Sequence, residues 1–137
     1  MERQERREQI LNILAAGIRK VLLNTVPKPE ELQEIRMRLG QPLRVVRGKE
    51  EIVLRSGTEP YIVTKEELRE TMDYISHYSL YAYENELRQG FVTVEGGHRV
   101  GVAGKVIMEK ERVKNIQYIS SLNIRVSHEV LGCADRL

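Results

Sequence analysis

The sequence predicts an α+β domain, a mostly antiparallel sheet with two or three helices packed on one face. Near the N-terminus, apolar residues recur at three- and four-residue steps, which is typical of an amphipathic helix. In residues 34–39 apolar and charged residues alternate strictly, which is typical of a half-buried strand. The last third of the chain consists of short strand-like runs separated by glycines.

Composition limits the classes of protein that this chain can be. Its 137 residues are 41% hydrophobic and 31% charged, which suits one globular domain and excludes a disordered chain. The net charge of +2 and an aromatic content of 5% argue against nucleic-acid binding. No apolar run is long enough to cross a membrane, and a start that mixes three acids with three arginines argues against a signal peptide. The single cysteine, Cys133, cannot form an internal disulfide, so we expect a cytoplasmic location.

Residues 3–24 are predicted to form one long amphipathic helix. Its first two turns are almost entirely polar, so we expect a solvated start and a packed end. Pro27 and Pro29 cannot continue the helix and end it. We therefore divide the chain into an N-terminal helix, residues 1–25, and a domain, residues 26–137. The helix is a candidate for docking to a membrane component or a neighbouring subunit, and packing on its own domain is an equal alternative.

Several short strands are predicted to follow one helical turn over residues 29–32. In the strand over 34–39, Ile35, Met37 and Leu39 share one face, and the other face is charged. The other predicted strands are residues 43–46, 52–54, 61–63, 91–94, 99–104, 106–108, 113–119 and 122–126. We expect a tight hairpin turn at Gly96–Gly97, where glycine permits a positive φ.

Two further helices are predicted in the middle of the chain. Thr64 is a good N-cap, and Glu67 completes a capping box, so a helix begins there and extends to about Ser79. A third helix over residues 80–88 is closed by Gly90.

The glycine-rich stretch that ends at Lys105 does not match a phosphate-binding P-loop. That loop reads G-x-x-x-x-G-K-[ST], because its glycines let backbone amides approach phosphates and its hydroxyl meets Mg²⁺. With Gly104 and Lys105 as the G-K pair, the first glycine position holds Arg99 and the hydroxyl position holds Val106. The chain therefore has no nucleotide-hydrolysing loop of its own. We interpret Gly101 and Gly104 as sites of a bulge or of close approach between elements.

No residue pattern indicates metal binding or intrinsic catalysis. The histidines lie on different predicted elements: His77, His98 and His128. They lack metal-ligand spacing, and nothing marks Cys133 as an activated nucleophile. We therefore expect no catalytic residue, metal or cofactor in this chain. The tyrosines at helical spacing, Tyr74, Tyr78 and Tyr81, favour packing or a subunit contact over a ligand platform.

Arginines on strands are the candidate binding residues. Arg99 and Arg125 lie inside predicted strands among apolar neighbours, while Arg36 and Arg38 project from a polar strand face. A strand holds the planar guanidinium group in a fixed direction, which suits a phosphate or a carboxylate. The alternative interpretation is a solvated face or a weak surface ion pair.

Three stretches resemble the stage III sporulation protein AA family. They are E-I-R-M-R-L-G-Q-P-L at 34–43, G-F-V-T-V-E-G-G-H-R-V-G-V-A-G-K at 90–105 and I-S-S-L-N-I-R-V at 119–126. The ending G-C-A-D-R-L at 132–137 is similar as well, so the similarity covers about 30–137. The resemblance implies a PAS-like N-terminal domain of an ATPase related to those of type II secretion, type IV pili and conjugation. In that family the Walker A loop follows the G-C-A-D segment, so the resemblance implies that this chain is the part before it.

The same resemblance implies a role in a longer protein. By similarity, Arg99 and Arg125 reach toward ATP phosphates in the full-length ring, with ATP and Mg²⁺ as its cofactors. This chain alone is expected neither to bind ATP tightly nor to hydrolyse it. The full-length protein is expected to be a homohexamer in the mother-cell cytoplasm, peripheral to the membrane. Its expected partners are other proteins of a channel complex between mother cell and forespore, and no nucleic acid.

Two alternatives of other classes stay open. One is a free-standing PAS-like module for interaction or ligand sensing, which an internal cavity with a bound small molecule would favour. The other is a nucleic-acid-binding module with Arg36, Arg38, Arg44 and Arg47 as a basic strip. Steeply salt-dependent DNA binding would favour that module, because phosphate neutralisation releases counterions.

Overall fold

The computed structural model describes residues 2–77, 79–109 and 112–128 and confirms the predicted α+β class. In these residues the helices are α1 (Glu2–Asn12), α2 (Ala16–Thr25), α3 (Lys65–Ile75) and α4 (Glu84–Gln89), with 3₁₀ turns η1 (Pro29–Glu31) and η2 (Leu80–Tyr83). The main-sheet strands are β1 (Glu34–Arg38), β2 (Arg44–Arg47), β3 (Glu50–Val53), β6 (Phe91–Val94), β7 (His98–Glu109) and β8 (Arg112–Arg125). A separate small hairpin consists of β4 (Arg55–Ser56) and β5 (Glu59–Pro60).

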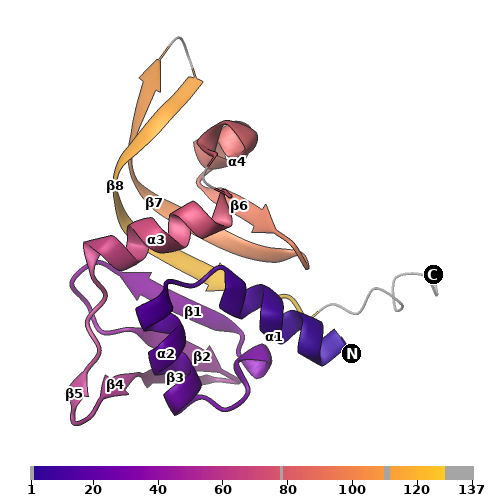
Figure 1. Cartoon of the computed structure of the whole chain (residues 1–137), viewed down its shortest axis with the longest axis vertical. Coiled ribbons are helices and arrows are strands. Elements are labelled where there is room, and N and C mark those ends of the chain that lie inside the picture. The colour runs from indigo at the N-terminus through magenta and orange to yellow at the C-terminus, as the bar shows by residue number, and fades with distance from the viewer. Residues whose placement is uncertain (1, 78, 110–111, 129–137) are drawn as a thin grey trace.

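The main sheet is antiparallel in the order β3-β2-β1-β8-β7-β6, and three helices lie against one of its faces. Figure 1 shows α1, α2 and α3 in front of the sheet, while the β7–β8 hairpin extends beyond it. The strand side chains under the helices are apolar and fully buried, among them Ile35, Met37, Val45, Leu122 and Ile124. We call the opposite side of the sheet the open face.

The first strand confirms the predicted alternation over most of its length. Ile35 and Met37 are fully buried, and Glu34 and Arg36 are on the opposite face. The prediction that Leu39 shares the buried face is wrong, because Leu39 lies beyond the end of β1 and is 41% exposed. The positive φ of Gly40 turns the chain away from the sheet at that point.

The N-terminal segment forms two helices instead of the one helix predicted over residues 3–24. Both helices contribute to the core, through Ile10 on α1 and Ile18 and Leu22 on α2, and Leu14 in the break between them is fully buried as well. Their apolar faces are therefore used in packing on the sheet. The first turns of α1 are polar and largely exposed, as predicted.

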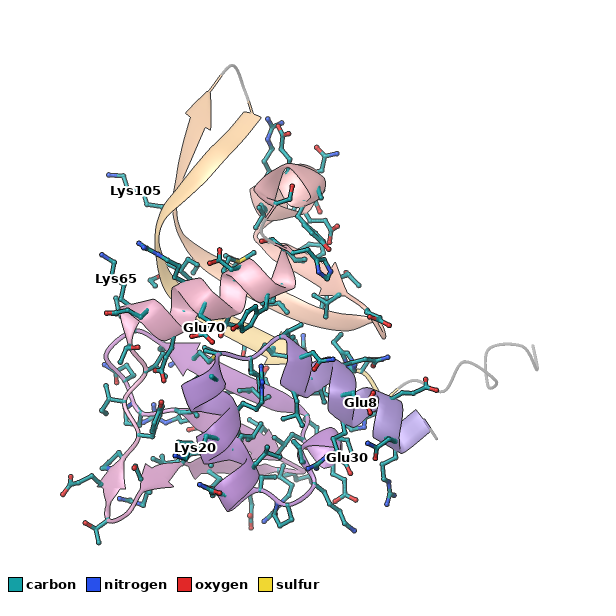
Figure 2. All side chains as sticks on the ribbon, in the orientation of Figure 1. Glu8, Lys20, Glu30, Lys65, Glu70 and Lys105 are labelled. Atoms are coloured by element: carbon teal, nitrogen blue, oxygen red, sulfur yellow. The ribbon has the colours of Figure 1, made fainter. Side chains whose placement is uncertain are left out.

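Side chains from other helices satisfy the backbone at the break between α1 and α2. The amides of Ala15 and Ala16 donate to Thr71 Oγ1 at 3.0 Å and to Glu70 Oε2 at 2.8 Å, both on α3. Figure 2 shows Glu70 between α3 and the start of α2. The guanidinium of Arg19 donates to the carbonyls of Leu11 and Leu14, both at 2.9 Å. These bonds cap the end of one helix and the start of the next, so the break is stable.

Removal of the Glu70 carboxylate is expected to destabilise the start of α2. Glu70→Ala takes away the acceptor of the Ala16 amide and a negative charge at a helix N-terminus. We expect the free energy of unfolding to fall by about 1 kcal/mol, measured by urea denaturation followed by circular dichroism. Arg69→Ala on the exposed side of the same helix is the control, and an equal effect of both variants would contradict this role.

The middle helices confirm the predicted signals. The capping box of α3 is complete: Glu67 N–H donates to Thr64 Oγ1 at 3.2 Å, and Thr64 N–H donates to Glu67 Oε1 at 2.9 Å. The helix ends at Ile75, earlier than predicted. The predicted third helix begins as the 3₁₀ turn η2 and continues as α4, which Gly90 closes with φ +88°.

Five of the predicted strands need correction. The predicted strand over 61–63 is a single bridge between Pro42 and Ile62. The runs predicted over 99–104 and 106–108 are one strand, β7, and those over 113–119 and 122–126 form β8. Register shifts between Ala103 and Met108 interrupt the alternation without ending the pairing, so the sequence pattern there resembles short separate strands. The hairpin turn is confirmed, with φ +94° at Gly96 and +81° at Gly97.

Candidate anion-binding site on the open sheet face

The strand register places the strand arginines in rows across the open face. Directly opposed residues on antiparallel strands share a face, so each row can be followed from strand to strand. One row contains Glu51, Val46, Glu34, Arg125, Arg99 and Thr93, from β3 to β6. The adjacent row contains Val53, Arg44, Arg36, Asn123, Gly101 and Phe91. The open face therefore presents arginines on four neighbouring strands.

On β1, β2 and β3, Arg36 and Arg44 are neutralised by neighbouring glutamates. Arg36 donates to Glu34 through Nε and to Glu51 through Nη1. The hydrogen bond to Glu34 is the main cause that raises the pKa of Arg36. Arg44 Nε lies 3.5 Å from Glu51 Oε1. Two arginines and two glutamates therefore offset one another in this half of the open face.

The other half carries two arginines that are far less neutralised. Arg99 and Arg125 are directly opposed on β7 and β8. The guanidinium carbon of Arg99 lies 4.1 Å from the centre of the Phe91 ring, a cation–π contact. The Arg125 side chain is 72% exposed, and its Nε lies 3.9 Å from Glu34 Oε1, a carboxylate that Arg36 already engages. Opposed like charges destabilise a sheet, and an anion between them relieves that cost.

Glu34 and Asn123 connect the two halves. Asn123 Nδ2 donates to Glu34 Oε1 at 3.1 Å, the same oxygen that faces Arg125. Asn123 Oδ1 is buried and has no hydrogen-bond partner. Beside it, Gly101 has no side chain, and a Cβ there would meet Asn123 only at 3.9 Å. The arginine pair therefore lies next to a shallow, partly polar area of the sheet.

The residues of the alternative basic strip are not equivalent. Arg36, Arg38 and Arg44 lie on the open face, but Arg47, the last residue of β2, is an odd number of residues from Arg44 and so belongs to the other face. Arg36 and Arg44 are paired with carboxylates, and Arg38 is exposed. The structure does not combine these four residues into one unpaired cationic strip.

The three histidines are not brought together. His128 Nε2 lies 2.8 Å from the Leu32 carbonyl, and His77 is exposed at the end of α3 with φ +51°. Among the described residues no group of three or more His, Cys, Asp or Glu side chains could hold a metal ion. Of the tyrosines, Tyr74 donates to Glu70 at 2.9 Å, and Tyr78 lies outside the described residues, as does Cys133.

Sequence reasoning missed the role of His98, which is 1% exposed and hydrogen-bonded through both ring nitrogens. A lone histidine at the start of a strand gave no signal of this role, because its partners are 89 and 29 residues away.

A groove of about 520 Å³ lies between α1, the end of α3 and β6. Its apolar side chains include Ile13, Ile75 and Val94, and its carboxylates are Glu5, Glu8 and Glu95.

Comparison with known proteins decides the family. The chain matches the family described as Sporulation stage III, protein AA over residues 4–137. It belongs to that family. It is 35% identical over 131 residues to stage III sporulation protein AA of Bacillus subtilis (strain 168), which covers 94% of this chain. The match covers 41% of that curated relative, so the chain spans about two fifths of its length.

No solved structure matches the chain. In the described part of this sporulation protein, no helix is long and apolar enough to span a membrane.

Proposed function

We propose that this chain is the PAS-like N-terminal domain of a sporulation ATPase, and that Arg99 and Arg125 bind phosphate oxygens of ATP in the full-length protein. One observation carries the proposal: these arginines are directly opposed on the open face and largely lack the carboxylate partners that neutralise Arg36 and Arg44. Family membership supports the sporulation role. The ATPase activity rests on the resemblance to secretion ATPases.

The residues present fit part of a nucleotide site. Two guanidinium groups supply bidentate donors for phosphate oxygens, and the strands and the Phe91 ring limit their movement. Bound ATP with Mg²⁺ supplies the phosphoryl group that is transferred to water. The chain has no P-loop, so another part of the full-length protein has to hold the nucleotide and the metal. The arginines then add positive charge where negative charge develops.

The wider assembly follows from the same proposal. The full-length protein acts as a homohexamer in the mother-cell cytoplasm, at the membrane, and transmits ATP-driven motion to a channel complex with the forespore. The open face lies toward the nucleotide, and the helices lie on the opposite side of the sheet. Motion is transmitted as rigid-body displacement, because the sheet and its helices share one core.

The proposal predicts a difference between two nucleotides. In the full-length protein, Arg99→Ala and Arg125→Ala are each expected to lower the affinity for a non-hydrolysable ATP analogue by about tenfold, since each removes a charge-assisted hydrogen bond. The affinity for ADP, which lacks the terminal phosphate, is expected to fall by less. Calorimetric titration measures both affinities, and Arg47→Ala is the control. Unchanged affinity for the analogue in both variants would refute the phosphate contact.

A further inference from the structure

Three segments that are distant in the sequence meet at the buried ring of His98. His98 is the first residue of β7. Its Nε2 lies 2.8 Å from Oε1 of Gln9 on α1, and its Nδ1 lies 2.9 Å from the backbone nitrogen of Ser127, just after β8. The turn before β7 closes over this contact, because a Cβ on Gly96 would lie only 2.0 Å from Gln9 Oε1.

The Ser127 amide fixes the protonation of the ring. A backbone N–H can only donate, so His98 Nδ1 accepts and carries no proton. The neutral ring then has its proton on Nε2 and donates it to Gln9 Oε1. A second proton on Nδ1 would face the Ser127 N–H, and the buried hydrogen bond would be lost.

Besides the bond to His98, α1 has polar contacts to Arg19 at its end and through Arg7 nearer its start. Arg7 donates to the Pro27 carbonyl at 3.1 Å, and its Nη1 is 3.6 Å from Glu30 Oε1. That glutamate oxygen is buried and has no hydrogen-bond partner. Ile10 is the one residue of α1 classed as buried in its described part. The bond between His98 and Gln9 therefore positions the helix together with the packing of Ile10.

We propose that His98 is a coupling joint: its two hydrogen bonds make the docking of α1 and the path of the chain after β8 mutually dependent, and protonation of the ring at Nδ1 breaks the bond from Ser127 and acts on α1 through that coupling. Because such coupling is reciprocal, displacement of the segment at Ser127 also loosens α1. The groove depends on the same joint, since α1 supplies Glu5, Glu8, Gln9 and Asn12 to its lining.

The surroundings of the ring set the direction of its pH dependence. Burial lowers the pKa of His98, and Arg6 on α1 and His128 after β8 lower it further. The unfolded chain therefore binds the proton more readily than the folded chain. The joint contributes its full stability above the unfolded pKa of about 6.5, and this contribution is lost as the pH falls through the lower folded value.

The coupling is tested by amide hydrogen exchange in the 137-residue chain, read at Ser127. Gln9→Ala removes the acceptor on α1 and leaves both members of the Ser127–His98 hydrogen bond in place. We expect the Ser127 amide to exchange about fivefold faster, the equivalent of one typical hydrogen bond. Gln4→Ala, on the exposed side of the same helix, should leave Ser127 protected. Unchanged Ser127 exchange in Gln9→Ala would overturn the coupling.

The proton dependence is tested with His98→Gln, which can donate and accept but cannot become charged. In the unmodified chain, protection of the α1 amides, corrected for intrinsic exchange, should decrease between about pH 7 and pH 5. In His98→Gln it should stay constant over this range. The same decrease in both proteins would show that another group titrates and would overturn the proposal.

Discussion

Alanine at Arg99 or at Arg125 is expected to lower the ATP hydrolysis rate of the full-length protein by about a hundredfold or more. This expectation rests on the proposed function. A fixed guanidinium stabilises charge that develops on the phosphoryl oxygens, so its loss acts on kcat more than on KM. Strand β7 and the Phe91 ring hold Arg99, and β8 holds Arg125. Steady-state phosphate release measures the rate.

The control for this prediction is Arg38→Ala. Arg38 is an exposed arginine on the same open face, one strand from the pair, so its removal changes the net charge equally. We expect the kcat of Arg38→Ala to stay within about twofold of that of the unmodified protein, because surface charges are weakly coupled to distant sites. Full activity in both the Arg99 and Arg125 variants, or an equal loss in all three, would remove the specific role of the pair.

Leu122→Ala is expected to cost about 3 kcal/mol of unfolding free energy. Leu122 lies on β8, is fully buried, and is opposed by Met37 on one side and Val102 on the other. Its truncation leaves a cavity in the middle of the sheet, where the paired strands limit relaxation. Urea denaturation of the 137-residue chain measures the loss.

Leu39→Ala is the matched control for the core substitution. Leu39 is also a leucine next to the sheet, but it is 41% exposed. Its truncation is expected to change the free energy of unfolding by less than about 0.5 kcal/mol. A loss for Leu39→Ala as large as that for Leu122→Ala would contradict the placement of the core.

The candidate site was only partly predictable. Alternation alone places Arg36 on the solvent side of a strand, and the same reasoning places Arg125 opposite to Ile124. It cannot show that Arg36 and Arg44 share Glu51, because that pairing depends on the β1–β2–β3 register. It also cannot show that Arg99 opposes Arg125, because bulges in the β7–β8 hairpin shift the count of residues.

The sequence by itself determined the features that depend on neighbouring residues. The capping box at Thr64, the left-handed cap at Gly90 and the Gly96–Gly97 turn form within a few residues, so local patterns specify them. The two-residue period likewise determined that Ile35 and Met37 are buried.

Only the tertiary structure decided the contacts between distant segments. The break between α1 and α2 depends on Thr71, whose hydroxyl accepts a hydrogen bond from the Ala15 amide, 56 residues away in the sequence. The partners of His98 lie 89 and 29 residues away. Hydrogen bonds of this kind form where packing brings a donor and an acceptor together. Neither periodicity nor composition shows which distant residues become neighbours in space.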